Sequence, residues 1–192
     1  AGLGRFAIAD GASESIYAGE WSRLLTEAFV SRPMPQLDWL TWLPPLRARW
    51  TAQAMRGGQS WYAQEKIDIG AFATFLGFEF TETIDRGRKW RAVAVGDSCL
   101  FQVRDGALVS SFPLHESSEF TTRPPLIGSR PNAPNVASLE RTAIGLLRPG
   151  DRLFLTTDAL GHWFLQECEA SNSPWELLAH MDPDICGMWV GG

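Results

Sequence analysis

The chain has 192 residues, of which 45% are hydrophobic and 20% are charged. This length and composition fit one folded domain with a substantial core, and they exclude disordered and fibrous proteins. Seventeen basic and 22 acidic residues give a net charge of −5, which argues against binding to nucleic acid or to an anionic membrane. The sequence contains no apolar run near the roughly 20 residues of a membrane-spanning helix. Three scattered cysteines favour a reducing compartment, so we expect a cytoplasmic protein.

The first elements are a strand and a helix. Residues 6–9 are apolar and predict a buried strand that ends at Asp10-Gly11. Residues 13–30 carry apolar side chains at helical spacing, with Ser13 as a suitable N-cap.

A second helical region is predicted over residues 37–55, interrupted at Pro44-Pro45. Its tryptophans, Trp39, Trp42 and Trp50, together with Trp61, are predicted to pack in the core, and a role of the segment 35–61 in substrate access is the alternative. Residues 67–82 alternate between two largely apolar sets, which is typical of a strand buried on both faces.

The second half reads as strands joined by turns, followed by helices. The Asp105-Gly106 pair is a strong hairpin signal, and residues 121–135, with four prolines, predict a surface loop. The remaining predicted elements are strands at 90–95, 98–103, 107–109, 136–144 and 152–157, turns at 85–88 and 148–151, and helices at 159–170 and 174–180.

Helices inserted among many antiparallel strands predict an α+β fold in a single domain over residues 1–192. Both ends of the sequence look like cuts through a fold, since a strand begins almost at once and the chain closes on a glycine-rich segment.

Several catalytic signatures are absent from the sequence. Cysteine phosphatases need an arginine six positions after the nucleophile, and the residues six positions after the three cysteines are Asp105, Pro174 and Gly192. Neither a Gly-x-Ser-x-Gly elbow nor a phosphate loop of the Gly-x4-Gly-Lys-Ser/Thr type occurs. Gly2-x-Gly4-x-x-Ala7 leads into a strand instead of a helix, so it is not a dinucleotide site. The histidines have no zinc-ligand spacing with the cysteines.

Three aspartates follow apolar strands, and they are the candidate functional residues. Asp10 follows Phe6-Ala7-Ile8-Ala9, Asp97 follows Val93-Ala94-Val95-Gly96, and Asp158 follows Leu153-Phe154-Leu155-Thr156-Thr157. Gathered by the fold, three such carboxylates would form a hard oxygen site suited to Mg²⁺ or Mn²⁺. The alternative is that each aspartate only caps a turn or a helix.

These residues lie in an ordered set of motifs that resembles the metal-dependent protein phosphatases of type 2C. The motifs are Phe6-Ala-Ile-Ala-Asp-Gly11, Gly70-Ala-Phe-Ala-Thr-Phe-Leu-Gly77, Trp90-Arg-Ala-Val-Ala-Val-Gly-Asp-Ser98 and Pro149-Gly-Asp-Arg-Leu-Phe-Leu-Thr-Thr-Asp158. The resemblance covers the chain from about Phe6 to His180, and bacterial members with a Thr-Asp-Ala variant are most similar. It implies an α-β-β-α sandwich, in which two antiparallel sheets are flanked by helices.

The resemblance also implies a site and a reaction. Asp10 would bridge two Mn²⁺ or Mg²⁺ ions, the carbonyl of Gly11 would bind one of them directly or through water, and Asp158 would be a ligand of the other. Asp97 matches a position that in some members helps to hold a third ion. The implied reaction is hydrolysis of phosphoserine or phosphothreonine in a protein substrate by a metal-activated water, so no protein nucleophile is required.

The sequence departs from the family pattern at several points. The first strand, with its acidic pair and phosphate-binding arginine, would precede residue 1, and the last strand would follow the helix that ends near His180. Asp182 and Asp184 lie there, but their surroundings do not match that strand. Asp158 is followed by Ala159, and His162 stands where many members have a carboxylate.

We therefore expect a monomeric bacterial-type Ser/Thr protein phosphatase whose partner is a phosphorylated protein, with no nucleic-acid or membrane partner. The alternative is a phosphatase-like binding or regulatory module with an incomplete metal site. A third hypothesis is an unrelated metal hydrolase that acts on small phosphoesters. The sequence does not predict substrate-binding residues.

Overall fold

The computed structural model describes residues 4–31, 38–57, 67–84, 87–133 and 135–179. The strands are β1 (Arg5–Ile8), β2 (Phe72–Ala73), β3 (Phe75–Ile84), β4 (Gly87–Val95), β5 (Cys99–Arg104), β6 (Ala107–Phe112), β7 (Ile127–Gly128), β8 (Arg141–Leu147) and β9 (Arg152–Thr156). The helices are α1 (Ala18–Ser31), α2 (Trp39–Ala54), α4 (Asp158–Glu169) and α5 (Pro174–Ala179), with short 3-10 helices at Met55–Gly57, Ser117–Glu119 and Val136–Ser138.

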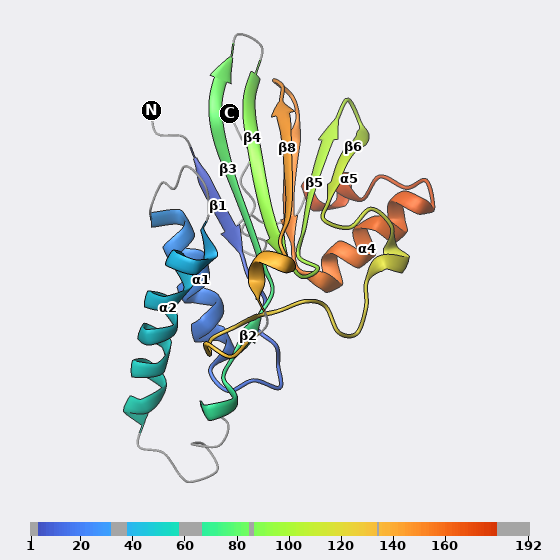
Figure 1. Cartoon of the computed structure of the whole chain (residues 1–192). Helices are drawn as coiled ribbons and strands as arrows, with labels where there is room; N and C mark the ends of the chain where they lie inside the picture. Colours follow the sequence, from blue (N-terminus) through green and yellow to red (C-terminus); the bar gives the residue numbers. More distant parts are fainter. Residues whose placement is uncertain (1–3, 32–37, 58–66, 85–86, 134, 180–192) are drawn as a thin grey trace.

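The strands form two main antiparallel sheets and one small one. The first main sheet has the order β1-β3-β4-β8, and the second has the order β6-β5-β9. Strands β2 and β7 pair as a separate two-stranded sheet. Helices α1 and α2 lie beside the first sheet, and α4 and α5 lie beside the second (Figure 1). The predicted α+β class and the α-β-β-α arrangement are both confirmed.

Three apolar clusters follow this layering, and β3 contributes to two of them. Its side chains alternate between the α1–α2 layer, which Phe75 contacts, and the space between the sheets, which Phe78 fills. The third cluster lies between the second sheet and α4, where the rings of Phe101 and Phe164 stack at 4.2 Å. The prediction of a strand buried on both faces is therefore confirmed for β3.

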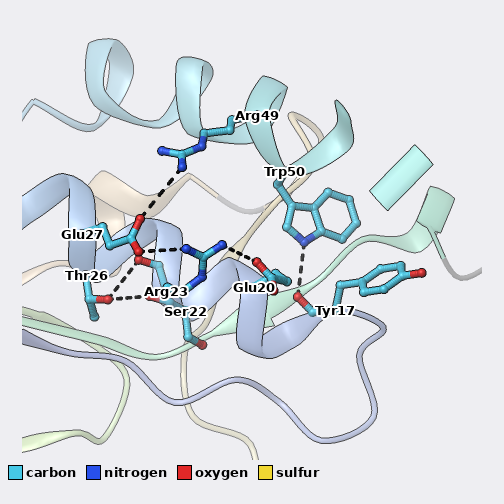
Figure 2. Close-up of polar contacts among 8 residues, drawn as sticks. All are labelled: Tyr17, Glu20, Ser22, Arg23, Thr26, Glu27, Arg49 and Trp50. Atoms are coloured by element: carbon cyan, nitrogen blue, oxygen red, sulfur yellow. Dashed lines mark hydrogen bonds and ion pairs between the residues drawn. The ribbon is translucent and has the colours of Figure 1, made fainter. Parts of the chain in front are cut away.

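Helices α1 and α2 pack through buried tryptophans, and polar contacts link them at the surface. Trp50 Nε1 donates to the carbonyl of Tyr17 at 3.3 Å, and Arg49 lies 4.0 Å from Glu27 (Figure 2). Trp39, Trp42 and Trp50 all belong to the core cluster, as predicted from the sequence. Trp61 lies outside the described residues.

The predicted start of the first helix is wrong. Helix α1 begins at Ala18, and Ser13 is not its N-cap. The chain after β1 instead continues to pair with the β2 segment, since Ala12 N donates to Phe72 O at 2.9 Å. Tyr17 then adopts a φ of 53°, a left-handed conformation that a helix cannot contain.

The predicted interruption at Pro44-Pro45 is also wrong, because α2 runs through both prolines. Asp38 caps its first turn through a bond from Leu40 N at 3.1 Å. Both prolines lie on the exposed side of the helix. Water can therefore solvate the two carbonyls that lack a helical N–H donor, which keeps the cost of the missing bonds low.

Three other predicted boundaries change. Residues 67–69 are helical, and Thr74 then separates β2 from β3. The predicted loop 121–135 contains β7, whose Ile127 is fully buried and accepts a 2.8 Å bond from Trp21 Nε1. The strand predicted at 136–144 is a 3-10 turn followed by β8, which begins at Arg141. Within the described residues, no helix is long and apolar enough to cross a membrane.

Candidate functional site

Asp10 lies where the chain leaves the first sheet. Its N–H donates to Thr74 Oγ1 at 3.1 Å, and Thr74 N donates to the Asp10 carbonyl at 2.9 Å. Gly11 forms the next bridge, with Ala73. A Cβ at Gly11 would stand 2.8 Å from the backbone of Ala18 at the start of α1, so only glycine fits between the strand and the helix. The backbone of the Asp10-Gly11 pair is thus fixed on both sides.

Asp97 lies in the turn that carries the chain from β4 in the first sheet to β5 in the second. Gly96 has a φ of +102°, and a Cβ there would lie 2.6 Å from Thr74 Cγ2. Thr74 Oγ1 and Ser98 Oγ are 2.8 Å apart in a buried contact. Thr74 therefore bonds both the Asp10 segment and the Asp97 turn, and links two of the three predicted aspartates.

Asp158 is the first residue of α4, and Thr157 alone separates it from the end of β9. Thr157 is the N-cap, and Gly161 N donates to its carbonyl at 2.8 Å. A carboxylate in the first helical turn is favoured by the helix dipole. The Asp158 side chain is exposed, in contrast to that of Asp97, which is 7% exposed.

The fold brings the three aspartates to one end of the sandwich. The side chains of Asp10 and Asp158 lie within hydrogen-bonding range of each other. Burial, followed by the charge of Asp158, raises the pKa of Asp10. Burial also raises the pKa of Asp97 to about 6, with further contributions from Asp158 and Asp10. The carboxyl group of Asp97 therefore interacts electrostatically with the other two carboxylates.

This donor set fits a divalent cation. Two ionised carboxylates in contact both accept hydrogen bonds and neither donates, so their repulsion is relieved by a proton or by a positive ion between them. Carboxylate oxygens and a neighbouring main-chain carbonyl such as that of Gly11 are the ligands of Mg²⁺ and Mn²⁺. Within the described residues, His, Cys, Asp and Glu side chains do not assemble into a metal-binding group of three or more. The candidate site is therefore a contacting pair with Asp97 nearby.

The sequence interpretation missed the link between Thr74 and Ser98. Thr74 is a 4% exposed polar residue in an apolar stretch, and this break in the pattern is the signal that could have identified it. Thr156 Oγ1, at the end of β9, is buried and has no hydrogen-bond partner among the described residues, and it lies 2.9 Å from the position that a Cβ of Gly161 would occupy. It lies beneath the first turn of α4.

His162 lies one turn after Asp158 on α4. Its ring meets that of Phe120 edge-on at 5.4 Å between centroids. This contact packs the histidine against the loop that precedes β7. Asp182 and Asp184 lie outside the described residues.

Comparison with solved structures shows which fold this is. The Mycobacterium tuberculosis serine/threonine phosphatase PstP/Ppp aligns with a TM-score of 0.50 and 19% identity, over 83% of this chain and 70% of that chain. The chain has the type 2C phosphatase fold. The predicted resemblance is thus confirmed at the level of the fold.

Two further solved structures align with this chain at lower TM-scores. PppA, a key regulatory component of T6SS in Pseudomonas aeruginosa, has a TM-score of 0.48 and 19% identity, over 94% of this chain and 74% of that one. A Stage II Sporulation E family protein from Thermanaerovibrio acidaminovorans has a TM-score of 0.48 and 18% identity, over 83% of this chain and 79% of that chain. The sequence matches no protein-family model and no curated protein.

Proposed function

We propose that this chain is a Mn²⁺- or Mg²⁺-dependent phosphatase that removes phosphate from phosphoserine or phosphothreonine in proteins. The observation that supports this function is the contact between the Asp10 and Asp158 carboxylates at one end of a type 2C fold. Two carboxylates held together against their mutual repulsion are expected where a cation binds, not where a turn is merely capped.

In this proposal Asp10, the carbonyl of Gly11 and Asp158 would together hold two divalent ions. Divalent ions, when bound, supply a lower pKa for the attacking water and positive charge for the phosphate oxygens. The protein contributes rigidity, because Thr74 and Ser98 fix the backbone from which Asp10 projects. Asp97 contributes a buried negative charge, which would favour a third ion. No protein nucleophile takes part.

The proposed substrate is a phosphorylated protein, and we propose that the enzyme works as a cytoplasmic monomer. We also propose that residues 1–192 belong to a single type 2C phosphatase-like domain.

The test is hydrolysis of p-nitrophenyl phosphate and of a phosphothreonine peptide with Mn²⁺, with EDTA, and after Asp158→Asn. We expect turnover that requires Mn²⁺ and falls more than about 100-fold in the variant, because even substitutions one shell away from a metal cost 10- to 100-fold. Asp105→Asn is the matched control. It neutralises an exposed aspartate at a φ of 49°, which asparagine tolerates, in the hairpin between β5 and β6.

Equal turnover by the Asp158→Asn and Asp105→Asn variants would contradict the assigned ligand. No turnover from the unsubstituted chain would favour the alternative, a phosphatase-like binding module, which is consistent with a pair of carboxylates in place of a group of three among the described residues. Hydrolysis of small phosphoesters without hydrolysis of the phosphopeptide would favour an unrelated phosphoesterase.

A further inference from the structure

A groove runs along α2 where the helix faces the segment that follows β7. Two cavities, of about 550 Å³ and 300 Å³, lie between α2 and the segment after β7. Both are lined by Pro44, Arg47 and Pro131, so they form one continuous depression. We refer to it as the α2 groove.

The helical wall of the α2 groove is an apolar stripe with one cation at its centre. Leu40, Pro44, Arg47 and Thr51, with Met55 at the C-cap, follow one another at spacings of three or four residues, which places them along one face of α2 and its C-terminal end. Leu40 and Met55, at its two ends, are 79% and 57% exposed. A stripe of this span is roughly 22 Å long at 1.5 Å per residue. That length matches about seven residues of extended chain.

Arg47 is half-buried in this stripe, and no acidic side chain of the described residues balances its charge. Its Nε donates to the carbonyl of Gly128 at 3.1 Å, and it forms no ion pair with the described residues. Burial lowers the pKa of Arg47, and among the described residues no carboxylate opposes that shift. Arg130, which also lines the groove, differs because Asp68 lies 3.4 Å from its guanidinium. Among the described residues that line the groove, Arg47 is thus a cation without an acidic partner, and apolar surfaces lie on either side of it.

We propose that the α2 groove binds an extended segment of a partner protein in which an acidic residue is flanked by apolar side chains. The acidic side chain pairs with Arg47, and the flanking side chains cover the two cavities. A single half-buried cation favours this occupant over an anionic membrane or a nucleic acid, since both of these are bound by several exposed basic residues. The apolar lining on either side of Arg47 would be left exposed by a free anion.

The groove lies close to the candidate metal site. Gly128, which accepts the bond from Arg47, pairs with Phe72, and the neighbouring Ala73 bridges to Gly11. Two strand spacings, about 10 Å, therefore separate the wall of the groove from the Asp10-Gly11 segment. A segment bound in the groove would lie beside the site, but its binding does not depend on catalysis.

Binding is tested with the full chain and three pools of fluorescein-labelled heptapeptides. Each pool is degenerate in Leu, Val, Ala and Pro around a central Glu, Gln or Lys, and binding is measured by fluorescence anisotropy. We expect the Glu pool to bind about ten-fold more tightly than the Gln pool, because a charge-assisted hydrogen bond in a half-buried site contributes more than a neutral one. The Lys pool should bind most weakly.

Three variants separate the groove from the rest of the helix. Arg47→Leu should abolish the preference for the Glu pool, whereas Arg49→Leu, on the α1 side of the same helix where Figure 2 shows Arg49 beside Glu27, should leave it unchanged. Ala52→Trp fills the larger cavity without removing the Arg47 bond to Gly128, and should weaken binding of the Glu pool. Thermal unfolding checks that each variant is folded.

Equal affinity of the unsubstituted chain for the Glu and Gln pools would overturn the proposal. So would an equal loss of the preference for the Glu pool in the Arg47→Leu and Arg49→Leu variants. Self-association of the chain that is abolished by Ala52→Trp would show that a second copy occupies the groove instead. Retention on vesicles of phosphatidylserine that requires Arg47 would assign the groove to a membrane. Because none of these measurements uses turnover, they remain decisive if the proposed phosphatase activity fails.

Discussion

An aspartate lies near each end of strand β9, and the two side chains have opposite surroundings. Asp151, before the strand, is fully buried as a side chain and accepts bonds from Arg104, from Gln102 Nε2 at 2.7 Å and from Arg148 N at 2.8 Å. Burial alone would raise its pKa, but these donors together lower it. Asp158, after the strand, lies against Asp10 and raises the pKa of that carboxyl.

The contrast separates a carboxylate that stabilises the fold from one that is available for a ligand. Every oxygen of Asp151 is used by donors from the protein, so its charge contributes to stability and leaves nothing for a cation. Asp10 and Asp158 offer two acceptors to each other, which costs stability unless a cation or a proton intervenes. Asp151 and Asp158 are the same residue type and both lie near an end of β9, and they differ only in the side chains that surround them.

The largest expected effect comes from Asp10→Asn. We expect turnover with Mn²⁺ to fall more than about 100-fold, as for Asp158→Asn, while the unfolding temperature in EDTA rises because the repulsion with Asp158 disappears. Steady-state kinetics and calorimetry measure the two effects. A fall in both activity and unfolding temperature would mean that Asp10 is a structural carboxylate like Asp151.

A second prediction concerns the backbone that holds the acidic end together. Gly96→Ala should lower the free energy of unfolding by about 2–3 kcal/mol, since it combines a left-handed backbone with a collision against Thr74. Gly106→Ala is the matched control, because its φ is +72° but no atom lies near the added methyl group. It should cost about 1 kcal/mol. If urea unfolding shows that Gly96→Ala and Gly106→Ala lower the free energy of unfolding equally, the contact between the new methyl group and Thr74 does not destabilise the protein.

A third prediction addresses Asp151. Asp151→Asn should lower the free energy of unfolding by about 2 kcal/mol at pH 7, because donors that the carboxylate satisfied lose a charged partner. Its pKa in the folded protein is below the ordinary 3.8, so the stabilisation is complete above that pH and is lost as the pH falls through the lower, folded value. Urea unfolding should therefore show a difference between the wild type and the variant that shrinks below pH 3.8. A difference that grows on acidification would contradict this pairing.

The smallest effect is expected at the surface of α1. Arg23 contacts Glu20 at 2.7 Å and Glu27 at 2.9 Å, but its side chain is 48% exposed (Figure 2). Water and salt screen such pairs, and holding long side chains in place offsets most of the attraction. Arg23→Ala should leave the unfolding temperature within the scatter of replicate scans. A loss of stability as large as that of Asp151→Asn would mean that the burial of an ion pair does not decide its contribution to stability at Arg23 and at Asp151.

Local pattern was sufficient for the elements whose signals lie within a few residues. The Asp105-Gly106 turn, with φ values of 49° and 72°, and the alternation along β3 were both predicted correctly. Boundaries failed where distant atoms decided them. Ser13 has the chemistry of an N-cap, but the preceding residues bond to the β2 segment and delay the helix to Ala18. Pro44 has the chemistry of a helix break, but it lies on the exposed side of the helix, where solvent can reach the carbonyl that loses its helical donor.

The sequence by itself determined the α+β class and the position of three aspartates after apolar strands, because periodicity and turn chemistry act over short stretches of chain. The layered sandwich was predicted from the family resemblance of its motifs. Only the tertiary structure decided that Asp10 and Asp158 meet, that Asp97 is buried near them and that Asp151 is neutralised by Arg104. A pKa depends on which charges and donors lie within a few ångströms, and folding brings those together from distant parts of the chain. The surroundings of Arg47 could not be predicted from the sequence for the same reason. They come from α2 and from the segment after β7, which meet only in the folded protein.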